Sequence, residues 1–133
     1  MTYLLDTNVC IRLLANSHQK VRQQYVAAGS TQVAICSIVK AELFYGAHKS
    51  QRIQANIAAI NHFVSPLISL PFDDTAANIY GQIRVQLESK GTPIGPNDLI
   101  IASIALANNL TLVAHNTREF SRVANLQIED WEL

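Results

Sequence analysis

Residues 96–116 read PNDLIIASIALANNLTLVAHN, and this stretch decides the fold class. Its first part is apolar at nearly every position, which predicts a helix that is buried around most of its circumference. Asn108 and Asn109 mark the end of that helix, and residues 111–114 form a short apolar run with the character of a strand. A buried helix that leads directly into a buried strand is typical of α/β proteins, in which helices cover a parallel sheet.

On both sides of this stretch, short strand-like runs alternate with longer helical patterns. Further strands are expected over residues 3–6, 32–36, 67–70 and 126–128. Helices are expected over residues 7–16, 21–28, 37–48, 51–64 and 73–90, and a short one over residues 117–123. We therefore predict a single domain over residues 1–133 with a three-layer α/β fold, in which a parallel, twisted sheet carries helices on both faces.

The composition is that of a globular protein. Apolar residues make up 49% of the 133 residues and charged residues 15%, which argues against disorder. Ten basic and ten acidic residues balance each other, so net charge neither favours nor excludes a nucleic-acid partner. Cys10 and Cys36 lie in apolar stretches without the spacing of a metal site, and we interpret them as reduced core thiols.

No segment has the pattern of a membrane span or an export signal. The longest apolar run, residues 99–107, is too short to cross a bilayer. Residues 1–6 contain no basic side chain and end in an acid, unlike the start of a signal peptide. We therefore expect a cytoplasmic protein without membrane contact.

Three acidic residues lie in otherwise apolar surroundings: Asp6 after Tyr-Leu-Leu, Glu42 within the helix 37–48, and Asp98 at the start of the quoted helix. Acidic side chains are rarely buried unless they are paired or bind a metal ion. Asp6 ends the first expected strand, and parallel α/β folds bind ligands beyond the carboxyl ends of their strands. We predict that these three carboxylates share one divalent cation, Mg²⁺ or Mn²⁺, because both ions prefer oxygen ligands.

Each of these acids also has a purely structural explanation. Asp6 fits the cap of the helix that follows it, and Asp98 fits the first turn of a helix, where the helix dipole favours an anion. Glu42 fits a solvated position if its helix is less buried than its sequence indicates. Taken singly, the structural explanation is preferred for the two aspartates, whereas the joint occurrence of all three around one crevice favours a metal site.

Four segments together resemble PIN-domain proteins, in particular the VapC toxins of bacterial toxin–antitoxin pairs. They are LDTN at residues 5–8, SIVKAELFYG at 37–46, GPNDLIIA at 95–102 and NTREF at 116–120, and the closing EDW at 129–131 matches as well. Each segment alone is a weak signal. All of them in this order and at this chain length are specific, and the resemblance covers essentially the whole chain.

The resemblance implies a metal-dependent endoribonuclease toxin that cleaves cellular RNA by phosphodiester hydrolysis, with a tRNA as one candidate substrate. Asp6, Glu42 and Asp98 match the family's main metal-binding acids, and these are the expected catalytic residues. Asn8 and Ser37 match polar positions that help to hold those acids. The cofactor implied is Mg²⁺ or Mn²⁺.

Asn116 and Glu119 complete the expected site as supporting residues. Many members of the family have an acid where Asn116 stands, and Glu119 matches a less constant acid. The departure at Asn116 leaves the number of metal ions open. Both residues also fit a capping box, with Asn at the cap and Glu three residues on, which would explain them without a metal.

The partners implied by the resemblance are an RNA substrate, a second copy of the chain in a homodimer, and a cognate VapB-like antitoxin whose tail enters the active-site groove. Basic side chains around the mouth of the site are expected to grip the RNA backbone. The candidates are Arg118, Arg12, Lys40, Lys49 and Arg84.

Other functions remain as alternatives. The first is a non-catalytic PIN-like module that binds RNA or protein, which a metal titration would distinguish. A phosphatase of the haloacid dehalogenase type is disfavoured because Asn8 replaces the second acid of its strand-ending motif. A response-regulator receiver is disfavoured because the acidic pair and the phosphorylated aspartate that it needs are absent from the expected places.

Overall fold

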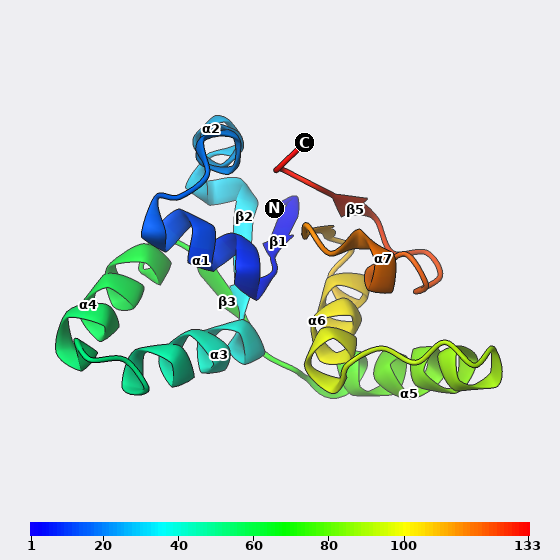
Figure 1. The fold of residues 1–133 in the computed structure, drawn as a ribbon. Coiled ribbons are helices and arrows are strands. Elements are labelled where there is room, and N and C mark those ends of the chain that lie inside the picture. The colour runs from blue at the N-terminus through cyan, green and yellow to red at the C-terminus, as the bar shows by residue number, and fades with distance from the viewer.

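A computed structural model describes residues 1–133 and contains one five-stranded sheet in which every pairing is parallel (Figure 1). The strand order is β3-β2-β1-β4-β5. The strands are β1 (Tyr3–Leu5), β2 (Val33–Cys36), β3 (Ile68–Leu70), β4 (Thr111–Val113) and β5 (Ile128–Glu129). The first strand of the chain is therefore the central strand of the sheet, and Asp6 follows it directly.

Seven α-helices surround the sheet: α1 (Thr7–Ala15), α2 (Gln19–Ala28), α3 (Ser37–His48), α4 (Ile53–Val64), α5 (Asp74–Ser89), α6 (Pro96–Ala107) and α7 (Thr117–Phe120). Helices α1 to α4 pack together as one group, and α5 packs against α6 as a second group. The two groups lie on either side of the strands in Figure 1, and α3 meets α6. This arrangement confirms the predicted α/β architecture with helices on both faces of a parallel sheet.

Burial in the core accounts for the apolar character of residues 96–116, the stretch that indicated the fold class. Helix α6 buries six residues, and all four residues of β2 are buried. Such continuous burial is expected for elements covered on both sides, because no face is left to water.

Asp73 caps α5, where its carboxylate accepts a hydrogen bond from the amide of Ala76 at 2.9 Å. No helix has the length and apolarity that crossing a membrane would require.

The differences from the predicted elements lie at their ends. The helix expected over residues 37–48 begins at Ser37 as α3, and Cys36 holds the cap position. The predicted strand 126–128 shifts to Ile128–Glu129, because its register is set by pairing with Leu112 and Val113 of β4. Such boundaries depend on partners distant in sequence, which local patterns do not reveal.

Candidate active site

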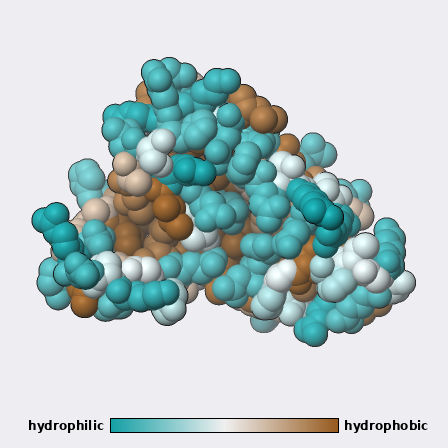
Figure 2. Space-filling model, viewed as in Figure 1, coloured by the Kyte–Doolittle hydropathy of each residue, from teal (hydrophilic) through white to brown (hydrophobic).

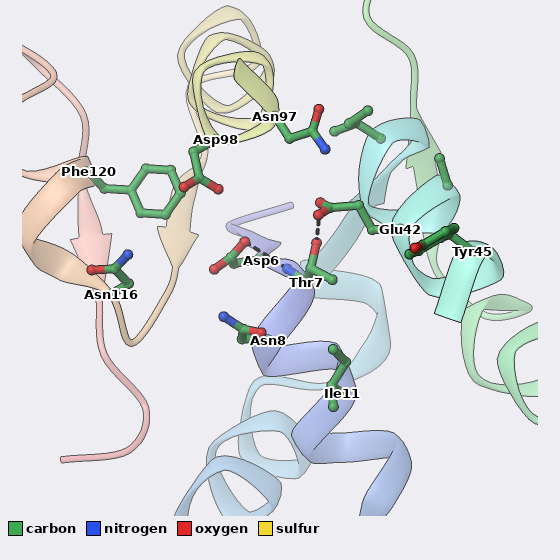
Figure 3. A pocket seen from close by; sticks show the side chains of 12 residues that line it. Asp6, Thr7, Asn8, Ile11, Glu42, Tyr45, Asn97, Asp98, Asn116 and Phe120 are labelled. Carbon is green, nitrogen blue, oxygen red and sulfur yellow. Dashed lines mark hydrogen bonds between the residues drawn. The ribbon is translucent and has the colours of Figure 1, made fainter. Parts of the chain in front are cut away.

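A cavity of about 530 Å³ opens at the carboxyl end of β1, where the first turns of α1 and α6, the helix α3 and the turn before α7 meet (Figure 3). Its walls carry the three predicted acids. The lining residues are Asp6, Thr7, Asn8, Ile11, Ile38, Ala41, Glu42, Tyr45, Asn97, Asp98, Asn116 and Phe120. The structure thus brings together side chains that are widely separated in sequence, at the edge of the sheet predicted to bind ligand.

Asp6 is the most buried of the three acids, with 5% of its surface exposed. Its carboxylate accepts a hydrogen bond from the amide of Thr7 at 2.8 Å and so caps α1. Burial, together with the negative charge of Glu42, raises the pKa of Asp6 to about 6, although the Thr7 amide opposes this shift. Asp6 therefore both caps α1 and contributes a carboxylate to the cavity.

Glu42 is half-buried on α3 and faces the cavity (Figure 3). One of its carboxylate oxygens accepts a hydrogen bond from the hydroxyl of Thr7 at 2.7 Å. Thr7 thus contacts two acids, through its amide to Asp6 and through its hydroxyl to Glu42. Sequence reasoning did not assign a role to Thr7; its place inside the LDTN segment is the signal that could have indicated one.

Asp98 lies in the first turn of α6, where Pro96 is the first helical residue, and its carboxyl group points into the cavity (Figure 3). The pKa of Asp98 is raised to about 7, mainly by burial and then by the negative charge of Asp6. The nearby carboxyl group of Glu119 and the charge of Glu42 add to the shift. The helix dipole at this position favours an anion, but burial and the neighbouring carboxylates outweigh it.

The donor set fits a hard divalent cation. Asp6, Glu42 and Asp98 present only oxygen. Burial and mutual repulsion raise the pKa values of Asp6 and Asp98, and a positive ion would offset both effects. No three acidic, histidine or cysteine side chains converge closely enough to form a ready-made shell. Mg²⁺ is suited to such an open arrangement because it keeps several waters and binds through one or two carboxylates.

The supporting residues fall into two groups. Asn8 and Asn116 line the cavity with the acids, whereas Glu119 lies outside the lining and acts on Asp98 by raising its pKa. Asn116 occupies the cap position of α7, but its side chain makes no capping hydrogen bond, so the predicted capping box is not formed. Ser37 lies outside the cavity lining, and its hydroxyl donates to the carbonyl of Leu70 on β3 at 3.1 Å.

None of the basic residues predicted to grip RNA lines the cavity. Arg12 forms an ion pair with Glu132 at 3.5 Å, and Arg84 pairs with Glu88 at 3.2 Å on the exposed face of α5. Lys49 lies over the ring of Tyr45, with its ammonium 5.3 Å from the ring centroid. The remaining two candidates, Arg118 and Lys40, also lie outside the lining. The polar part of the cavity wall therefore consists of acids, amides and the hydroxyls of Thr7 and Tyr45.

A second groove adjoins the acidic cavity between α1, α3 and α4. It has a volume of about 370 Å³, and seven of its ten lining residues are hydrophobic. Ile11 and Glu42 line both spaces, so the groove is continuous with the cavity. Figure 2 shows a patch of hydrophobic surface between these helices.

Comparison with known proteins places this arrangement in a family, since the model of the PIN domain matches residues 3–126. The chain belongs to the PIN domain family. It is 42% identical to the tRNA(fMet)-specific endonuclease VapC of Shigella flexneri, over 98% of both chains, and 42% identical to ribonuclease VapC2 of Rickettsia felis, over 99% of both. The solved structure of DNA-bound VapBC from Salmonella typhimurium matches it with a TM-score of 0.93 and 40% identity, over 98% of both chains. The predicted family membership is thereby confirmed.

Proposed function

We propose that this PIN-domain protein is an endoribonuclease toxin that needs Mg²⁺ or Mn²⁺ and hydrolyses phosphodiester bonds in cellular RNA. The observation that carries the proposal is the convergence of Asp6, Glu42 and Asp98 on one cavity. The family gives the reaction class, since relatives of nearly equal length are named as ribonucleases. A tRNA is a candidate substrate because the Shigella flexneri relative is named for one.

The chemistry assigned to each residue follows from its position. Asp6, buried at the end of β1, and Asp98 on α6 would hold the cation, with Glu42 completing the negative charge on the opposite wall. Thr7 orients two of these carboxylates through its amide and its hydroxyl. The bound cation supplies the positive charge that allows a phosphodiester to approach the acids and lowers the pKa of an attacking water.

Two protein partners belong to the same proposal. Solved structures similar to this chain are VapBC complexes, so we propose a VapB-like antitoxin as the inhibitor of this protein. Its tail would cover the acidic cavity and the apolar groove that adjoins it, where Ile11 and Glu42 lie at the junction. A homodimer acting in the cytoplasm on RNA completes the proposal.

The decisive experiment is cleavage of total cellular RNA by the purified protein, followed by sequencing of the new 5′ ends. We expect discrete cuts with Mg²⁺ or Mn²⁺ and none with EDTA, because the carboxylates repel phosphate when no cation is bound. Cleavage that continued in EDTA would contradict metal dependence. Binding of RNA without any cleavage, in the presence of either metal, would favour the non-catalytic module instead.

A further inference from the structure

The wall of the cavity formed by Asn116 and Phe120 has the least support from its own segment. These residues belong to the turn after β4 and to α7, a helix of four residues. The strand that follows, β5, has two residues and pairs only with β4 at the edge of the sheet. The other walls come from α1, α3 and α6, which have nine to twelve residues each. Contacts with residues distant in sequence are therefore needed to hold this turn in place.

A side-chain pair supplies that support from the C-terminal segment. His115, the residue before Asn116, lies with Nδ1 3.0 Å from a carboxylate oxygen of Asp130. The other oxygen of Asp130 accepts a hydrogen bond from the amide of Glu132 at 2.9 Å. Both oxygens of this carboxylate are therefore engaged, and its side chain is only 9% exposed. A carboxylate held at both oxygens is a fixed anchor for the imidazole.

The anchor is itself tied to the body of the protein. Trp131 is buried and packs edge-to-face on Tyr3 of the central strand, with ring centroids 5.3 Å apart. Glu132 forms an ion pair with Arg12 of α1 at 3.5 Å, and its other carboxylate oxygen lies 3.5 Å from Nε2 of His18 before α2. These contacts place the C-terminal end of the chain beside β1, near the N-terminus (Figure 1). The C-terminal segment therefore contacts both strand β1, which Asp6 follows, and the turn that carries Asn116.

We propose that His115 and Asp130 are positioning residues for the active site, which hold the turn of Asn116 against the cavity. The inference rests on the proposed ribonuclease function and gives the EDW segment, residues 129–131, a role in it. Asn116 is free to respond to the pair because its own side chain makes no capping hydrogen bond. The carbonyl of His115 also accepts the amide of Thr117 at 2.8 Å, so movement of His115 would displace the start of α7.

The test uses the full-length protein and an oligoribonucleotide that spans the cut site mapped for the unaltered protein. His115→Ala should lower kcat by roughly 10- to 100-fold, the range seen when a group that orients a metal-site residue is lost. KM should stay within about twofold, and His115→Asn should restore most of kcat, because its amide can still donate to Asp130. His62→Ala on α4, far from the site in sequence and exposed, is the matched control and should leave kcat unchanged.

A double-mutant cycle separates positioning from a general structural role. If the pair acts through Asn116, then His115→Ala should cost little further activity in a protein that already carries Asn116→Ala. Equal losses in both backgrounds, or no loss from His115→Ala alone, would overturn the inference. Asp6→Asn measured beside them keeps the two proposals apart: if it abolishes cleavage while His115→Ala does not lower it, only the positioning role fails.

Discussion

Helices α1 and α5 both have an aspartate at the cap position, with different consequences. Asp6 accepts the amide of Thr7 at 2.8 Å, and Asp73 accepts the amide of Ala76 at 2.9 Å. Asp73 is exposed, whereas Asp6 is buried with the charge of Glu42 beside it. At α5 the exposed carboxylate acts as a cap that stabilises the helix. At α1 the carboxylate is also buried beside another negative charge, so its ionised form is destabilised, and a bound cation would offset that cost.

The largest expected effect of this difference is on activity. Asp6→Asn keeps the capping oxygen of α1 but removes the charge, and it should lower the rate of RNA cleavage by on the order of 10³-fold, about 4 kcal/mol in the barrier. Glu42→Gln and Asp98→Asn should act in the same direction. Asp73→Asn, the matched change at the other cap, should cleave at the rate of the unaltered protein. Initial rates with Mg²⁺ measure all four variants, and near-normal cleavage by two of the three cavity variants would disprove the site.

The second effect is on the pH dependence of stability without metal. In the folded protein the pKa of Asp6 rises from 3.8 to about 6 and that of Asp98 to about 7, so the folded state binds more protons than the unfolded state. The free energy of unfolding should therefore fall as the pH rises from about 4 towards 7, by on the order of 3 kcal/mol for Asp6.

Urea denaturation in EDTA between pH 5 and 8 checks this slope. Asp6→Asn should flatten it and stabilise the metal-free protein at pH 8, and Mg²⁺ should do the same to the unaltered protein. Asp73→Asn should leave the slope as it is. If the metal-free protein were as stable at pH 8 as at pH 5, the proximity of the carboxylates would have no energetic consequence and the comparison would fail.

A smaller effect is expected when the exposed cap itself is removed. Asp73→Ala should lower the free energy of unfolding by about 1 kcal/mol, because the amide of Ala76 loses its partner. Asp73→Asn retains an acceptor and should be neutral. Thermal denaturation of both variants distinguishes a cap from a surface charge, since loss of stability in the asparagine variant would indicate that charge matters at this end of α5.

The smallest effect concerns Asn116, whose amide lines the cavity without capping α7. Asn116→Asp adds a charge that faces the cation, so Mg²⁺ should bind several-fold more tightly while the stability of the Mg²⁺-loaded protein changes little. Calorimetric titration of both proteins with Mg²⁺ gives the dissociation constant and the stoichiometry. Unchanged values would remove Asn116 from the metal site.

The sequence revealed the cavity's acids for a physical reason. Asp6, Glu42 and Asp98 each interrupt an apolar pattern, and such interruptions are visible without a structure. Thr7 was missed because its hydrogen bond to Glu42 joins residues that only the fold brings together. The contact of Ser37 with the carbonyl of Leu70 could not be predicted either, because it depends on the pairing of β2 with β3.

The contacts of the basic residues, in contrast to the place of the acids, could not be predicted from the sequence. Long cationic side chains on exposed helix faces are compatible with many positions relative to a site, so their sequence carries little information about what they contact. Arg84 was a candidate for gripping RNA, yet its guanidinium lies beside Glu88 and the hydroxyl of Tyr80. Arg12 binds the C-terminal segment instead. The fold class, by contrast, followed from the alternation of whole elements, which no single contact can change.

The strand order has a consequence for the synthesis of this protein. The central strand β1 is translated first, but its neighbour β4 spans Thr111–Val113 and the acid Asp98 also comes late. At ribosomal speeds of about 5–20 residues per second, several seconds separate the synthesis of Asp6 from that of its partners. A nascent chain that ends before Asp98 lacks one of the three cavity acids, so the proposed site can form only after most of the chain has been synthesised.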